Sequence, residues 1–128
     1  MVRYAPLLTN QALKPSADMK FLDKNEKEAI NKFKDILMKN YLNDIGNFYL
    51  FGSKARGDFH KNSDIDILIT LKNYNWKLGD KIRRIGYELD EEIDYKFSII
   101  IISESEFQTL KDNKYQFYMN VLNDGVII

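Results

Sequence analysis

Apolar positions recur every three or four residues in two long stretches of the chain, which is the period of an α-helix. The first stretch follows Asp23 and Glu26, which are spaced as an N-terminal capping box, so we predict a helix over residues 24–43. The second stretch predicts a helix over residues 80–92. The apolar positions of the two stretches are Ile30, Phe33, Ile36, Leu37, Tyr41, Ile82, Ile85, Leu89 and Ile93.

Three short apolar stretches predict β-strands. Residues 47–51 are largely aromatic and bounded by glycines, and residues 95–102 end in four consecutive isoleucines. In residues 64–71 apolar and other side chains alternate. This alternation places one apolar face on the core and puts Asp64 and Asp66 together on the opposite face.

Two further helices close the chain. Ser103 and Glu106 form a second capping box before Phe107 and Leu110, and a last helix is expected over residues 114–123. The order helix, strand, strand, helix, strand, helix, helix predicts an α/β (α+β) domain built on a small sheet.

Composition narrows the possible functions. The chain has 128 residues, with an irregular lead-in over residues 1–22 that holds Pro6 and Pro15 and one expected domain over residues 23–128. Lys plus Arg and Asp plus Glu both total 19, and this balance argues against a dedicated nucleic-acid binder. The absence of cysteine excludes thiol chemistry, and the single histidine, His60, argues against histidine metal clusters. No apolar run is long enough for a membrane span and no signal-like segment is present, so we expect a cytoplasmic protein.

One constellation carries candidate chemistry. Gly52 and Ser53 follow a predicted strand, where a glycine allows close backbone approach and Ser53 can cap a short helix whose N-terminus suits phosphate. Asp64 and Asp66 lie about 6.5–7 Å apart at the backbone and can converge on Mg²⁺. Each part alone is more often a turn or a solvated strand edge. Together, at this spacing, they indicate phosphoryl or nucleotidyl transfer.

Neighbouring polar residues extend this site. Arg56 is positioned either to bind a phosphate oxygen or to remain solvated, and Ser63 can orient Asp64. A Walker phosphate loop is excluded because Asp58 and Phe59 follow Gly57 where that motif requires Lys and Ser or Thr.

The segments Gly-Ser-Lys-Ala-Arg-Gly-Asp (52–58) and Ser-Asp-Ile-Asp-Ile-Leu-Ile (63–69) resemble the signature of minimal nucleotidyltransferases of the DNA polymerase β superfamily. The resemblance covers about residues 24–128. It implies a nucleotidyltransferase fold with a small mixed sheet and helices packed mainly on one face. It also implies that Gly52 and Ser53 hold the triphosphate and that Asp64 and Asp66 bind the metal ions.

The resemblance further implies a third acidic residue on the following antiparallel strand. Asp94, at the start of that strand, is the candidate for this third metal ligand. If the family position falls instead at Lys96 or Ser98, the third carboxylate is missing, and the site would bind nucleotide without it.

Two surface features are open to two interpretations. Lys81, Arg83 and Arg84 form a basic cluster that is either a solvated helix face or a contact for a polyanion or an acidic partner. The apolar C-terminal segment over residues 115–122 either packs in the core or forms a partner interface.

Three functional hypotheses follow. The first is Mg²⁺-dependent transfer of a nucleoside monophosphate, AMP from ATP or its equivalent from another triphosphate, to a hydroxyl. This hypothesis follows the resemblance to antitoxins whose partner is a helical HEPN-type ribonuclease. The second is a binding module of the same fold that neutralises its partner stoichiometrically. The third is transfer to a small molecule such as an aminoglycoside, which requires an extra helical domain, or a dimer or second chain, to complete the pocket.

Overall fold

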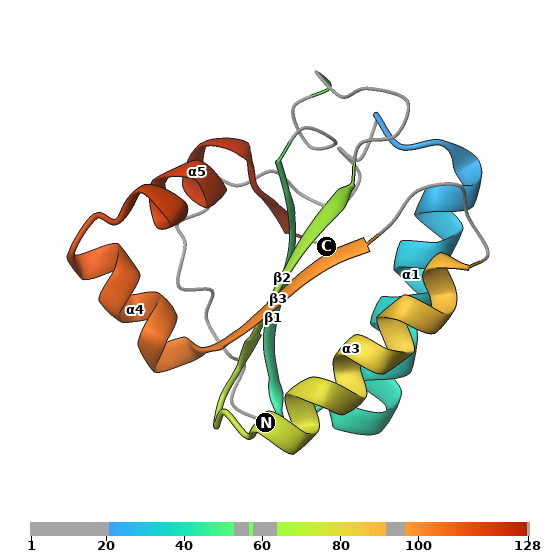
Figure 1. Cartoon of the computed structure of the whole chain (residues 1–128), viewed down its shortest axis with the longest axis horizontal. Helices are drawn as coiled ribbons and strands as arrows, with labels where there is room; N and C mark the ends of the chain where they lie inside the picture. The colour runs from blue at the N-terminus through green and yellow to red at the C-terminus, as the bar shows by residue number, and fades with distance from the viewer. Residues whose placement is uncertain (1–20, 53–56, 58–63, 92–96, 128) are drawn as a thin grey trace.

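The structure is a computed structural model that describes residues 21–52, 57, 64–91 and 97–127 (Figure 1). A sheet with the strand order β3-β2-β1-β4 lies between two layers of helices. The elements are α1 (Lys24–Tyr41), β1 (Ile45–Phe51), β2 (Ile65–Leu71), α3 (Trp76–Asp90), β3 (Phe97–Ser103), α4 (Glu104–Asp112), α5 (Gln116–Asp124) and β4 (Val126–Ile127). The α+β class and each helix and strand expected from the sequence are confirmed within the described residues.

The strand directions follow from the connections. β1 and β2 pair antiparallel, and Phe51 lies opposite Asp66. β3 pairs parallel with β2, so the antiparallel direction expected for the third strand is wrong. The helical crossover through α3 returns the chain to the end of the sheet where β2 began, and a parallel pair results. β4, too short to give a signal in the sequence, pairs antiparallel with β1.

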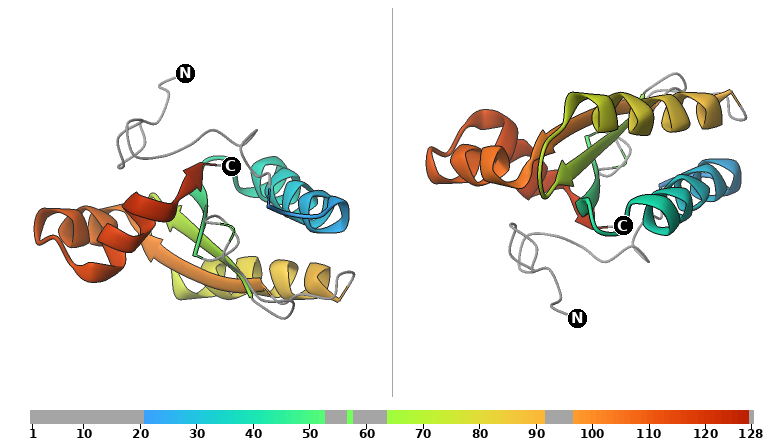
Figure 2. Two further views of the ribbon diagram at one scale, coloured as in Figure 1. Left: turned by 90° about the horizontal axis from the view of Figure 1, so that it is seen from above. Right: turned by 90° about the horizontal axis from the view of Figure 1, so that it is seen from below.

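Helices cover both faces of the sheet, two on each side, rather than mainly one face (Figure 2). α1 and α3 bury one set of sheet residues, which includes Ile67, while α4 and α5 bury the other, which includes Tyr49 and Leu68. The reason lies in β2, whose last five residues are all buried. A strand that is apolar on both sides needs a covering layer on each.

The α1–α3 layer packs around Phe33. Its ring contacts Phe48 edge-on at 5.4 Å between centroids and stacks on Phe97 at 6.0 Å. Gly86 of α3 brings that helix close, because a Cβ there would overlap the end of Ile99 and lie 3.0 Å from the Phe33 ring.

Helix boundaries reflect their caps. The capping box at α1 is confirmed, since the Glu26 amide donates to Asp23 Oδ1 at 2.8 Å and the Asp23 amide donates to Glu26 Oε1 at 2.9 Å. α3 begins at Trp76, about one turn earlier than predicted. Asn75 explains this difference because its Oδ1 accepts from the Lys77 amide at 2.9 Å.

A buried polar cluster lies at the end of the sheet where β2 finishes. The Glu104 carboxylate packs over Gly46 beside the hydroxyl of Thr70, which accepts from the Asn47 amide at 2.8 Å. Glu104 Oε1 is buried and has no hydrogen-bond partner among the described residues, and burial raises the pKa of this carboxyl to about 7. The folded protein therefore holds a proton on Glu104 at pH values where the unfolded chain has lost it.

We predict that two alanine substitutions in α3 have opposite effects. Gly79→Ala should raise the free energy of unfolding by about 0.5–1 kcal/mol, because its Cβ would meet only ordinary contacts at 3.5 Å or more and alanine favours a helix. Gly86→Ala should lower it by about 1–3 kcal/mol through overpacking. Urea denaturation of both variants tests this, and a Gly86→Ala protein as stable as Gly79→Ala would contradict the packing described.

We also predict that stability depends on the protonation of Glu104. Folding raises the pKa of the Glu104 carboxyl. The contribution of this group to the free energy of unfolding is therefore complete below pH 4.5 and is lost as pH rises through about 7. Glu104→Gln should remove this part of the pH dependence and raise the melting temperature above pH 7. Thermal unfolding from pH 5 to pH 8.5 measures it, with Glu106→Gln, an exposed neighbour on the same helix, as the control.

Candidate active site

The site expected from the sequence lies where β1 ends and β2 begins, at the upper end of the sheet in Figure 1. The antiparallel β1–β2 pair brings Gly52 against Asp66 across the sheet. Asp64 stands just before β2 and is exposed, while Asp66 is half-buried between Ile65 and Ile67, which are fully buried. The strand thus anchors both carboxylates by its apolar residues.

Gly52 is required at its position for two reasons. Its φ of +74° lies in the left-handed region, which side chains other than glycine rarely adopt. A Cβ there would also overlap the Asp66 carboxylate. The backbone at the end of β1 and the Asp66 carboxylate therefore lie in direct contact.

A cavity of about 370 Å³ adjoins Asp64. Its other lining residues come from the C-terminal half of α3, Tyr87 and Asp90, and from the start of β3, Phe97 and Ser98. Asp90 Oδ2 accepts a hydrogen bond of 3.3 Å from the Phe97 amide, which ties the end of the helix to the strand. The participation of Tyr87 and Asp90 was not predicted, because nothing in their local sequence relates them to residue 64.

The position beside Asp66 on the third strand is occupied by Ser98. The parallel register of β2 and β3 pairs these two residues directly. Within the described residues β3 carries no carboxylate, and no group of three acidic or histidine ligands able to hold a metal is found there. Asp64 and Asp66 are oxygen ligands of the kind that Mg²⁺ takes, and one or two protein carboxylates commonly suffice when phosphate oxygens complete the shell.

Four of the predicted site residues lie outside the described residues. They are Ser53, Arg56, Ser63 and Asp94. Gly57, between two of them, has a φ of +93° and contacts the Phe21 ring, so the chain after Gly52 returns to the segment that precedes α1.

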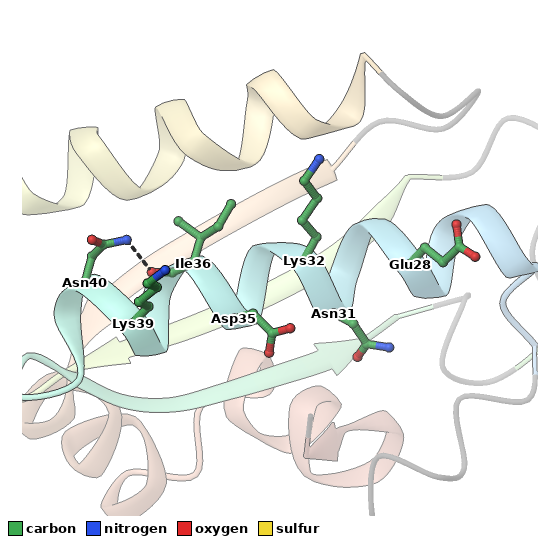
Figure 3. A pocket seen from close by; sticks show the side chains of 7 residues that line it. All are labelled: Glu28, Asn31, Lys32, Asp35, Ile36, Lys39 and Asn40. Atoms are coloured by element: carbon green, nitrogen blue, oxygen red, sulfur yellow. Dashed lines mark hydrogen bonds between the residues drawn. The ribbon is translucent and has the colours of Figure 1, made fainter.

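A larger hollow of about 580 Å³ lies away from these residues, along α1 (Figure 3). All its described lining residues come from that one helix. Figure 3 shows that their side chains project from successive turns and do not converge on a point. Among the described residues, the α1 surface therefore offers no convergent set of groups comparable to the contact between Gly52 and Asp66.

A family model for the nucleotidyltransferase domain matches residues 30–121, which is most of the chain and includes Gly52, Asp64 and Asp66. The chain therefore belongs to this nucleotidyltransferase family, as its motifs predicted.

The chain is also similar to individual proteins. MJ0604, a candidate protein adenylyltransferase of Methanocaldococcus jannaschii, is 36% identical over 106 residues, which cover 81% of this chain and 98% of that protein. The protein adenylyltransferase MntA of Shewanella oneidensis is 37% identical over 75 residues, covering 55% of this chain and 48% of that protein. A crystal structure of a candidate nucleotidyltransferase from Sulfolobus solfataricus is 24% identical, with a TM-score of 0.42, over 87% of this chain and 82% of that one.

Across the residues that the structure describes, no helix has the length and hydropathy needed to cross a membrane.

We predict that Gly52→Ala lowers the free energy of unfolding by about 1–3 kcal/mol, the combined effect of a strained φ and contact with the Asp66 carboxylate. In the Asp66→Ala background, Gly52→Ala should lower the free energy of unfolding by less than it does in the wild-type protein, because the carboxylate that its Cβ would meet is gone. A double-mutant cycle in urea measures the coupling. Strict additivity of the two substitutions would show that Gly52 and Asp66 are not in contact.

Proposed function

We propose that this protein transfers AMP from ATP to a hydroxyl group of a protein partner, with Mg²⁺ as cofactor. The observation that carries the proposal is the contact between the Gly52 backbone and the Asp66 carboxylate, in a chain of the nucleotidyltransferase family. MJ0604 is named a candidate protein adenylyltransferase, and MntA is named a protein adenylyltransferase. These names support AMP as the transferred group and a protein as the acceptor.

The residues around Gly52 would hold the triphosphate. Gly52 has no side chain to obstruct a phosphate at the end of β1, and Ser53 adds a hydroxyl donor beside it. We assign Arg56 to a phosphate oxygen, where its planar guanidinium can donate two parallel hydrogen bonds. Ser63, directly before Asp64, is assigned the orientation of that carboxylate.

Asp64 and Asp66 would hold the metal, and Asp94 is our candidate for a third ligand. Mg²⁺ bound there offsets the negative charge of the triphosphate and favours attack at phosphorus. The exposed Asp64 faces the cavity of about 370 Å³, which leaves room for an acceptor beside it.

In the transfer itself the acceptor hydroxyl oxygen attacks the α-phosphorus of ATP. A new bond forms between that oxygen and phosphorus, the bond to the bridging oxygen breaks, and pyrophosphate leaves. The hydroxyl proton passes to solvent. The contribution of the protein is to fix the phosphates and the acceptor in line.

For the partner we propose a helical HEPN-type ribonuclease, modified on a tyrosine, in the cytoplasm where ATP is available. This protein would then act as the antitoxin of a two-gene module. The resemblance of its motifs to such antitoxins motivates the choice.

The proposal predicts nucleotide binding that depends on both aspartates. ATP with Mg²⁺ at about a hundred times its Kd should raise the melting temperature by several degrees, because ligand binding at that excess adds about 2.7 kcal/mol. Asp64→Asn/Asp66→Asn should abolish the shift, whereas Asp35→Asn, an exposed aspartate on α1, should keep it. Isothermal titration calorimetry with a non-hydrolysable ATP analogue gives the same comparison directly.

Transfer is tested with ATP labelled in either the α- or the γ-phosphate, mixed with the wild-type protein and its purified HEPN-type partner. The partner should acquire label from the α-position only, and Asp66→Asn should lose this activity. Label from the γ-position would identify a kinase instead.

The pairing of Ser98 with Asp66 supports one alternative, a binding module that neutralises its partner without transfer. A complex of undiminished affinity without ATP, and with Asp66→Asn, together with no labelling, would favour that function.

A further inference from the structure

One exposed face of α3 carries an ordered series of charges. From the N-terminal to the C-terminal end it presents two arginines, one tyrosine and two glutamates, after an initial aspartate. We call this set of residues the α3 stripe: Asp80, Arg83, Arg84, Tyr87, Glu88 and Glu91. Together they line a shallow hollow of about 370 Å³. The buried residues of the helix, among them Ile82 and Leu89, lie on its other side.

The charges of the stripe are largely unpaired within the described part of the chain. Arg83 lies 3.5 Å from Asp80, its neighbour in the preceding turn. Arg84, Glu88 and Glu91 are exposed and form no ion pair with any described residue. Tyr87, between the basic and the acidic half, exposes 44% of its surface.

We infer that the α3 stripe binds the same stripe of a second copy, with the two helices antiparallel about a two-fold axis near Tyr87. In that arrangement the basic half of each stripe faces the acidic half of the other. Arg83 faces Glu91 of the partner subunit, and Arg84 faces Glu88 of the partner subunit. The two-fold axis repeats both pairs on its other side. A parallel arrangement would place like charges together, so the order of charges selects the direction.

Two other properties favour self-association. The formal net charge of the chain is zero, so no overall repulsion opposes a dimer. Tyr87, which exposes 44% of its surface, places an aromatic ring at the centre of the stripe, beside the axis. Aromatic residues and arginine are the types enriched in protein interfaces.

The second copy would stand beside the candidate active site. Tyr87 lines both the α3 stripe and the cavity that adjoins Asp64. A copy docked on the stripe therefore forms part of the surroundings of that cavity. The inference goes beyond the proposed function and does not depend on it, because an oligomeric state is measured without nucleotide or acceptor.

Charge reversals test the inference by sedimentation velocity on the full chain, from micromolar to near-millimolar concentration at low salt. The wild-type protein should form dimers. Arg84→Glu and Glu88→Arg should each weaken dimerisation roughly tenfold or more, because each places like charges in contact twice. Lys39→Glu, which reverses the same charge at an exposed position of α1, should leave the dimer unchanged.

Recombining the reversed charges separates this arrangement from a general loss of folding. An equimolar mixture of Arg84→Glu and Glu88→Arg should form a heterodimer, and the double variant Arg84→Glu/Glu88→Arg should form a homodimer again. A wild-type protein that is monomeric at every concentration would overturn the inference. So would a dimer that both reversals leave intact, or single variants that the complementary charge does not rescue.

Discussion

β2 combines a buried body with a polar start. Its last five residues are buried, with helices on both sides, whereas Asp66 near its start is half-buried and the preceding Asp64 is exposed. Fully buried Ile65 and Ile67 flank Asp66, so the carboxylate is held by its neighbours in the strand rather than by a flexible loop. Because this strand is apolar on both faces, each face is covered by a layer of helices, and the rest of the fold follows from that.

Local signals in the sequence account for most elements. The capping box and the apolar stripe of α1 predict that helix almost to its last residue, and a bounded aromatic stretch predicts β1. Gly52 and Asp66 lie together in the structure because the antiparallel β1–β2 pair joins segments close in the chain, and each of these segments carries a recognisable local pattern. That part of the site depends only on the period of a strand and on a turn.

Long-range relations were harder to predict. An apolar run such as β2 does not reveal which helices cover each face, so the second layer was not expected. The parallel direction of β3 depends on the α3 crossover, and the lining of the cavity by Tyr87 and Asp90 depends on it in turn. The start of α3 was placed late because Trp76 and Lys77 are exposed and add nothing to an apolar stripe. The Asn75 cap was the available signal.

The contact between Gly52 and Asp66 joins residues of one antiparallel hairpin, whereas β3 reaches β2 only after the whole of α3 has been placed. Closing the longer loop costs more chain entropy, so during folding the hairpin can pair before the parallel strand docks. The glycine–carboxylate pair can therefore assemble from one continuous segment of the polypeptide. The cavity that adjoins Asp64 is completed later, when the crossover closes.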